Sequence, residues 1–225
     1  MAQVMSAYIV SKSDDAFHLF TDGGVFANDG TLYAKTKKTY MLAHMPAAMT
    51  VIGSRAWGLI LYPDLCMCHT LDHFLDNAEE RLRNYLPAVT TVVEKERSTT
   101  EFELIIAGYS ERHDRMVCFV IGNHQKSELS KPWKLREITE DSMNPAPSQE
   151  ALAALRPADD FILPRDGALI MQAQRNTLFP VFSEGAPGCG VGGFIQHTIV
   201  TRDQITTRIV HRWPDEIGKR IGTET

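Results

Sequence analysis

Four residues near the start of the chain have types and spacings suited to nucleophilic chemistry. Ser6 supplies a hydroxyl, Asp22 a carboxylate and Lys38 an ammonium, at two successive intervals of sixteen residues. Gly53 follows at the end of an apolar segment. A serine hydroxyl attacks a carbonyl only when a base takes its proton, and a nearby cation lowers the proton affinity of such a base. A backbone N–H at a strand end can stabilise the resulting oxyanion. We therefore take these four residues as the candidate catalytic set.

This spacing resembles that of the proteasome β-subunit family, including its divergent bacterial proteasome-like members. The resemblance is densest over residues 6–54, with Thr-Asp-Gly at 21–23 and Lys-Lys at 37–38. It continues through an amphipathic segment at 71–86 and two apolar segments within 102–121. The resemblance implies an α+β fold, a four-layer αββα sandwich of the N-terminal nucleophile (Ntn) hydrolase type.

The same resemblance implies a role for each residue of the candidate set. Ser6 would be the nucleophile, with its own α-amine as general base once residues 1–5 are removed. Lys38 would act electrostatically on that pair, and Asp22 would hold the lysine. The amide of Gly53 would donate to the oxyanion. Such an enzyme cleaves peptide or amide bonds, and neither a cofactor nor a metal is predicted.

No linker or repeat divides the chain, so we expect a single domain over 6–225. Residues 1–5, which precede Ser6, are a candidate prosegment. The resemblance also implies self-association into a homo-oligomer, with a ring as one form. A catalytically inactive, ring-forming structural subunit is the alternative function. Its motivation is the stretch Cys189–Gly193, which lacks the aspartate and serine that the family places before its glycine pair.

Two further hypotheses rest on cysteine and histidine residues alone. Cys189 and His197 could form a thiol nucleophile and its base, although nothing in the sequence brings them together. Cys66, Cys68 and His69 could bind a metal, but structural zinc sites generally take four ligands. The glycine-rich segment 185–193 lacks the Lys-Ser/Thr of a phosphate-binding loop, so a tight turn is the favoured interpretation.

Composition excludes several classes of protein. The chain has 225 residues, with Lys+Arg 23 against Asp+Glu 28 and a formal net charge of −5. Without a basic block, nucleic-acid binding is not expected. No apolar run approaches the ~20 residues of a membrane span, and no signal peptide is readable. Four cysteines in a chain of this length favour reduced thiols and a cytoplasmic location.

Hydrophobic periodicity predicts the elements that must position the candidate residues. Strands run first, then a helix over 71–86 ended by Pro87, then strands, helices and strands again. This segregation favours α+β over an alternating parallel sheet. The predicted strands are 7–10 paired with 17–20, 38–43, 49–52, 102–107 paired with 116–121, an edge strand within 133–138, and 194–201 paired with 204–211. The other predicted helices are 150–155, capped by Ser148, and 166–178.

Overall fold

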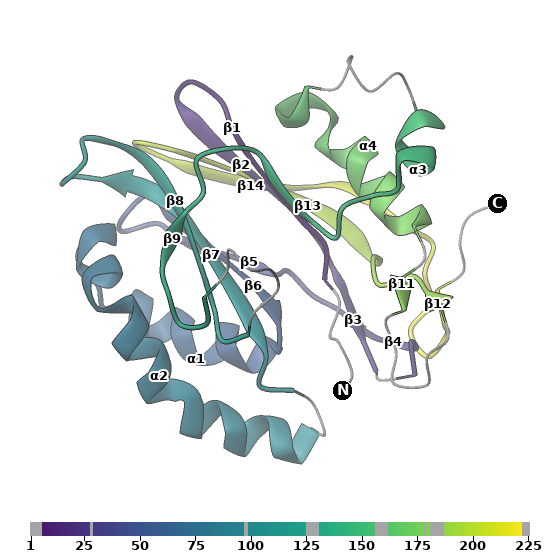
Figure 1. The fold of residues 1–225 in the computed structure, drawn as a ribbon, viewed down its shortest axis with the longest axis horizontal. Coiled ribbons are helices and arrows are strands. Elements are labelled where there is room, and N and C mark those ends of the chain that lie inside the picture. The colour runs from purple at the N-terminus through teal and green to yellow at the C-terminus, as the bar shows by residue number, and fades with distance from the viewer. Residues whose placement is uncertain are drawn as a thin grey trace.

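The computed structural model describes residues 6–27, 29–96, 99–124, 131–155, 162–177, 179–180 and 187–221. The candidate prosegment at residues 1–5 and part of the glycine-rich segment lie outside these residues. Two five-stranded sheets, antiparallel throughout, form the centre of the molecule (Figure 1). The sequence predicted an α+β fold rather than an alternating parallel sheet, and the antiparallel pairing of every strand agrees with that prediction.

The first sheet joins the two ends of the chain. Its strand order is β10-β1-β2-β13-β14. The predicted N-terminal and C-terminal hairpins are confirmed, and they meet where β2 pairs with β13, with Asp22 opposite Ile195. Strand β10 at the edge is not predicted by the sequence. The strands are β1 Tyr8–Lys12, β2 Ala16–Asp22, β10 Ser142–Asn144, β13 Phe194–Thr201 and β14 Ile205–Arg212.

The second sheet has the order β5-β6-β7-β8-β9. The predicted hairpin over 102–121 is confirmed as β7 and β8, and the edge strand predicted within 133–138 is confirmed only over residues 136–137. The strands are β5 Thr39–Leu42, β6 Ala47–Gly53, β7 Phe102–Ser110, β8 Arg115–Gly122 and β9 Arg136–Glu137.

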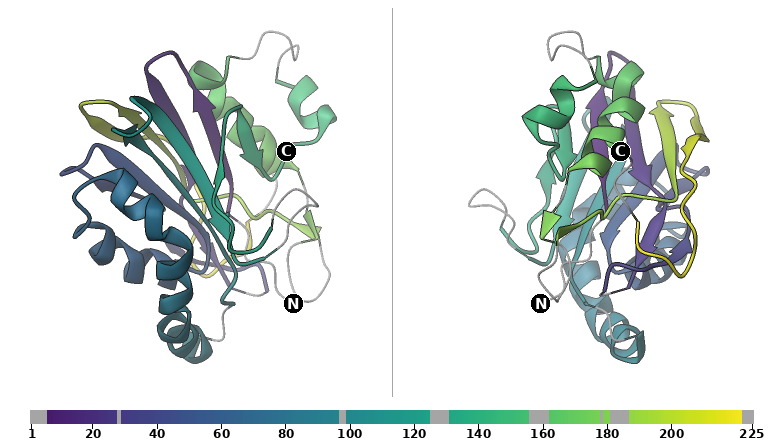
Figure 2. Two further views of the ribbon diagram at one scale, coloured as in Figure 1. Left: turned by 60° about the vertical axis from the view of Figure 1, so that its left-hand side comes forward. Right: turned by 90° about the vertical axis from the view of Figure 1, so that its right-hand side faces the viewer.

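Helices α1 (Arg55–Leu65) and α2 (Leu71–Glu96) cover the outer face of the second sheet (Figure 2). The sequence predicts no helix over α1. Its signals are a Ser54 cap, whose Oγ accepts from the Ala56 N–H at 3.3 Å, and the buried side chains of Trp57, Leu61 and Leu65 at helical spacing.

The prediction that Pro87 ends the second helix is wrong, because α2 continues to Glu96. Pro87 lies on the exposed side of the helix, so water can satisfy the carbonyl that loses its N–H partner. Val89 and Val93 are buried and extend the apolar stripe past the proline. Packing of that stripe against the sheet outweighs the local cost of the proline.

The outer face of the first sheet carries α3 (Gln149–Ala153) and α4 (Leu163–Asn176), which confirm the two later helices with shifted bounds. Ser148 caps α3 as predicted, its Oγ accepting from the Ala151 N–H at 3.1 Å. Gly167 lets α4 approach the sheet, since a Cβ there would lie 2.4 Å from the Phe20 ring.

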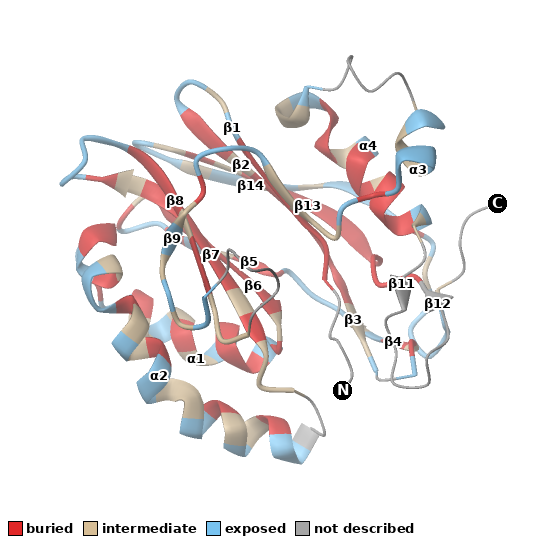
Figure 3. Cartoon of the chain, in the orientation of Figure 1, coloured by how far each residue is buried: buried red, intermediate tan, exposed pale blue. Residues whose placement is uncertain are grey.

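A third group of buried side chains fills the space between the two sheets. It joins residues of β1, β2 and β13 to residues of β6, β7 and β8, including Val10, Leu19, Ala48, Ile105 and Val200. Figure 3 shows that the buried residues concentrate on the strands and on the helix faces turned toward them. One cluster of buried side chains thus lies between α1, α2 and the second sheet, one between the two sheets, and one between the first sheet and α3 and α4.

Short segments close one end of the molecule. A two-stranded pair, β3 (Gly24–Phe26) and β4 (Leu32–Lys35), follows β2. The segment after β14 lies against β4, where Leu32 N donates to Lys219 O at 2.9 Å and Gly218 N donates to Leu32 O at 2.9 Å. The remaining pair is β11 (Phe179–Pro180) with β12 (Pro187–Gly188). Among the described residues, none of the helices combines the length and apolar character of a membrane span.

Candidate active site

Three of the four candidate residues meet at neighbouring strand ends. Ser6 lies two residues before the start of β1, Asp22 is the last residue of β2, and Lys38 directly precedes β5. The first two strands belong to one sheet and the third to the other, so the site lies where the two sheets come together. A spacing of sixteen residues thus places the three side chains in contact.

A hydrogen-bonded chain joins the three side chains. Lys38 Nζ donates to Asp22 Oδ1 at 2.6 Å and to Ser6 Oγ at 2.9 Å. The exposed fractions are 0% for Asp22, 5% for Ser6 and 8% for Lys38. A buried charge is costly unless it is paired, so the two opposite charges require each other.

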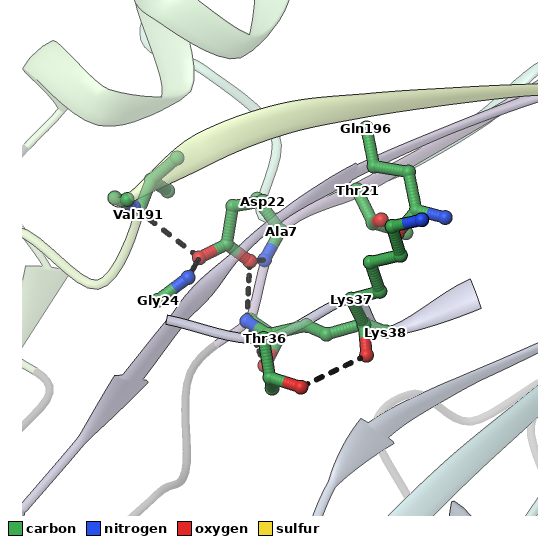
Figure 4. Close-up of polar contacts among 12 residues, drawn as sticks. Ala7, Thr21, Asp22, Gly24, Thr36, Lys37, Lys38, Val191 and Gln196 are labelled. Carbon is green, nitrogen blue, oxygen red and sulfur yellow. Dashed lines mark hydrogen bonds and ion pairs between the residues drawn. The ribbon is translucent and has the colours of Figure 1, made fainter. Parts of the chain in front are cut away.

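Backbone N–H groups hold the Asp22 carboxylate from several directions (Figure 4). Ala7 N donates to Oδ1 at 3.0 Å, while Gly24 N and Gly192 N donate to Oδ2 at 2.9 Å and 3.2 Å. With the lysine, four donors fix the carboxylate in one orientation. Asp22 therefore presents Oδ1 to Lys38 rather than rotating freely.

Burial lowers the pKa of the Lys38 ammonium, and the charge and hydrogen bond of Asp22 oppose that shift. The nitrogen lies within hydrogen-bonding distance of the only hydroxyl in this chain of contacts, that of Ser6. Such a lysine can stabilise negative charge developing on the serine oxygen, or depress the pKa of a neighbouring amine through like-charge repulsion.

Gly53 ends β6, and the contacts that join Ser6, Asp22 and Lys38 do not include it. Its φ of +101° lies in the region that favours glycine, and a Cβ there would lie 2.4 Å from Glu101 O. The chain then turns directly into α1. The structure thus supplies a conformational reason for this glycine.

Two glycine pairs interlock beside the site. Gly23 N donates to Gly192 O at 3.0 Å and to Phe194 O at 2.8 Å, and a Cβ on Gly23 would lie 2.6 Å from the Phe194 ring. Only residues without side chains allow this approach, so the Gly-Gly repeats at 23–24 and 192–193 have a shared structural cause. The favoured interpretation of the second pair as a tight turn agrees with this packing.

Buried polar residues that the sequence analysis missed surround the site. Thr39 Oγ1 lies 2.9 Å from Thr50 Oγ1 and 3.4 Å from Thr21 Oγ1. Gln196 receives a hydrogen bond from Thr39 N at 3.4 Å and donates to Thr39 O at 3.3 Å. Their only signal in the sequence is a polar residue at an inward position of an otherwise apolar strand.

The cysteine hypotheses find no geometry in the described part of the chain. Cys189 Sγ donates to Arg175 O at 2.6 Å, and burial raises the pKa of its thiol. His197 instead pairs with His18, so the proposed thiol and base have different partners. No group of three or more metal-ligating side chains occurs among the described residues, including those around Cys66 and Cys68.

Comparisons with known proteins add a structural likeness. No protein-family model matches the chain, and no curated protein matches its sequence. Among solved structures, a Gly-1 mutant of Anbu from Hyphomicrobium sp. strain MC1 superposes with a TM-score of 0.59 at 14% identity, covering 92% of this chain and 87% of that one. Anbu from Yersinia bercovieri, named an ancestral beta-subunit, gives a TM-score of 0.58 at 10% identity, covering 91% and 87%. The chain therefore has a proteasome-like fold.

Proposed function

We propose that this protein is a proteasome-like hydrolase of the Ntn class that cleaves peptide or amide bonds. Ser6 is the nucleophile, exposed as an N-terminus by removal of residues 1–5. The observation that carries the proposal is the buried chain from Asp22 through Lys38 to Ser6, with distances of 2.6 Å and 2.9 Å. A lysine that is paired with an aspartate and contacts a serine oxygen can assist acyl transfer. At a site without such a reaction, burying the same ion pair would only cost free energy of desolvation.

The architecture supports the same class of protein. Helices, sheet, sheet and helices follow in the order of an αββα sandwich, and the likeness to Anbu covers most of the chain. We propose that this domain self-associates into a homo-oligomer, with a ring as the expected form. Four free cysteines fit a reducing compartment, so we place the protein in the cytoplasm.

The proposed reaction begins with the α-amine of Ser6 in its neutral form. The amine takes the Oγ proton while Oγ bonds to the substrate carbonyl carbon, and Lys38 stabilises the developing charge on Oγ. The tetrahedral intermediate collapses as the scissile C–N bond breaks and the amine returns the proton to the leaving nitrogen. Water then hydrolyses the acyl ester with the same base.

The Gly53 amide is the proposed donor to the oxyanion. Its position at a strand end, with a backbone conformation that favours glycine, is typical of a donor that must approach a ligand closely. Loss of one such donor generally costs about 3 kcal/mol of transition-state stabilisation.

An intact mass spectrum of the native protein, followed by treatment with a β-lactone, tests the proposal. The expected result is a chain that begins at Ser6 and gains one lactone adduct on that residue. Ser6→Ala should abolish both labelling and hydrolysis of fluorogenic peptides. Ser11→Ala is the matched control, because Ser11 is buried in the first hairpin and its Oγ has no hydrogen-bond partner among the described residues.

The second candidate function is an inactive, ring-forming subunit. It is favoured by the segment 189–193, which brings backbone groups but no carboxylate or hydroxyl side chain to the site. A native chain that keeps residues 1–5, assembles and never labels would support this function and contradict the hydrolase.

A further inference from the structure

A second buried ion pair lies behind the candidate site. Arg175, in the last turn of α4, makes a bidentate contact with Asp215, in the segment after β14, at 2.7 Å and 3.1 Å. The exposed fractions of the two side chains are 3% and 4%. Desolvating both charges is costly, so a pair kept at this depth requires a structural or functional use.

The pair binds the two consecutive peptide units that flank Gly192 in the loop before β13. Arg175 Nη1 donates to Val191 O at 2.9 Å, and Gly193 N donates to Asp215 Oδ2 at 2.7 Å. Gly192 lies between them, and its N–H donates to Asp22 Oδ2 at 3.2 Å. The loop is therefore held from behind while its central amide holds the site carboxylate.

Close packing leaves this loop little freedom. A Cβ on Gly192 would lie 2.1 Å from Ile221 Cδ1 and 2.9 Å from Asp215 Oδ2. Lys35 Nζ donates to Asp215 O at 2.6 Å, which ties the C-terminal segment to β4. An unbroken series of contacts thus runs from the C-terminal segment through the loop to Asp22, Lys38 and Ser6.

We propose that Arg175 and Asp215 are positioning residues for the candidate active site, a role that rests on the proposed function. By fixing the loop, they keep the Gly192 N–H on Asp22, and Asp22 in turn keeps Lys38 directed at Ser6. The side chains that hold the loop around Gly192 come from the end of α4 and from the segment after β14, whereas the loop contributes backbone groups. Docking of residues 213–221 is then a condition for a competent site.

Asp215→Asn tests the proposal in the native protein, with Glu216→Gln as the matched control. Both changes remove one negative charge from adjacent positions, but the ion pair that Glu216 forms with Lys219 is exposed. Thermal unfolding and circular dichroism establish that each variant is folded. If Asp215→Asn fails to fold, the double variant Arg175→Gln/Asp215→Asn replaces it, since it leaves no unpaired buried arginine.

Hydrogen exchange is the first measurement and needs no activity. We expect the amides of Gly192, Gly193 and Gly24 to exchange at least about tenfold faster in Asp215→Asn than in wild type or Glu216→Gln. Unchanged exchange at Gly192 and Gly24 would overturn the proposal, whether or not the protein is an enzyme.

Ser6 reactivity is the second measurement. A displaced Lys38 depresses the pKa of the Ser6 amine less, so the acidic limb of the pH–rate profile for β-lactone labelling should move to higher pH in Asp215→Asn. The rate at pH 7 should fall about tenfold. A folded variant with the wild-type rate and profile would overturn the positioning role. A wild-type protein that never labels would contradict the proposed function instead, and the exchange measurement would still decide whether the pair holds Asp22.

Discussion

At the scale of single residues, the site is organised around one ammonium group that serves two oxygens. Lys38 balances the buried charge of Asp22 and also contacts the neutral hydroxyl of Ser6. Asp22 also accepts hydrogen bonds from three backbone amides, and among the described residues Lys38 is the cation that forms an ion pair with it. Stability and reactivity therefore depend on the same nitrogen.

Replacing Lys38 with methionine should lower both the stability of the protein and the reactivity of Ser6. The change leaves the buried carboxylate unpaired, so the free energy of unfolding should fall by about 3–5 kcal/mol. Labelling of Ser6 should fall at least about a hundredfold. Urea unfolding and β-lactone labelling measure the two effects. Lys37→Met is the control, because Lys37 is exposed. Its free energy of unfolding should lie within about 0.5 kcal/mol of that of wild type. A Lys38→Met protein as stable as wild type would contradict the ion-pair assignment.

A histidine pair on the first sheet, of which His197 is buried and His18 half-buried, predicts a pH dependence of stability. His18 Nδ1 and His197 Nε2 lie 3.1 Å apart, and His197 stacks on Phe20. Burial, together with His18 and Arg208, lowers the pKa of His197 to about 4. The unfolded chain binds this proton near pH 6.5, so the contribution is complete above pH 6.5 and is lost as the pH falls toward 4.

The expected loss between pH 7 and pH 4 is on the order of 2 kcal/mol from His197. Urea unfolding at several pH values measures it against His197→Gln, which should show a flatter dependence than wild type. His69→Gln, at an exposed position, should keep the wild-type slope. Identical slopes in wild type and His197→Gln would contradict the assignment.

At the scale of elements, α2 shows how tertiary packing overrides a local stop signal. Its buried residues continue in register past Pro87, and the hydroxyls of Thr90 and Thr91 donate to Leu86 O and Pro87 O at 2.8 Å and 3.1 Å. The carbonyl that loses its donor at Pro87 is that of Arg83, on the exposed side of the helix. Packing of the buried residues on the opposite side therefore keeps the helix intact although one backbone donor is missing.

Pro87→Ala should stabilise the protein, since alanine restores the missing N–H and has a higher helix propensity. We expect a gain of about 1 kcal/mol in the free energy of unfolding, measured with urea. Pro132→Ala, in an exposed turn, is the control and should be neutral or slightly destabilising. A loss of stability in Pro87→Ala would contradict this prediction and show that proline suits this position better than alanine does.

At the scale of the whole molecule, the two chain ends complete one site. Ser6 lies just before β1 and Asp22 ends β2, while the loop before β13 supplies Gly192 and the segment after β14 supplies Asp215. Segments from the first sheet, the second sheet and the C-terminal part of the chain thus contact one another at this site.

We expect the purified protein to be a homo-oligomer. Light scattering coupled to size exclusion should give a mass at a whole multiple, greater than one, of 25.2 kDa. The multiple should remain constant over a tenfold dilution in the micromolar range if the assembly is stable. A monomer at every concentration would contradict self-association.

Sequence patterns were sufficient for the hairpins, for the first turns of α2 and for the meeting of Ser6, Asp22 and Lys38. Period-two and helical periodicities are local, and a resemblance in spacing transfers a known arrangement. The same patterns missed α1 and β10 and ended α2 too early, because burial against a sheet, rather than local propensity, decides those segments. Gly53 remains a prediction for the oxyanion.

Only the tertiary structure joined Arg175 to Asp215, two residues separated by a loop and a complete hairpin. Neither residue has a neighbouring motif, and their pairing depends on where α4 and the C-terminal segment come to lie. The sequence thus determined which groups could react, because reactivity belongs to residue type and spacing. The fold decided what holds those groups in place, because support for a buried charge comes from whichever segments pack around it.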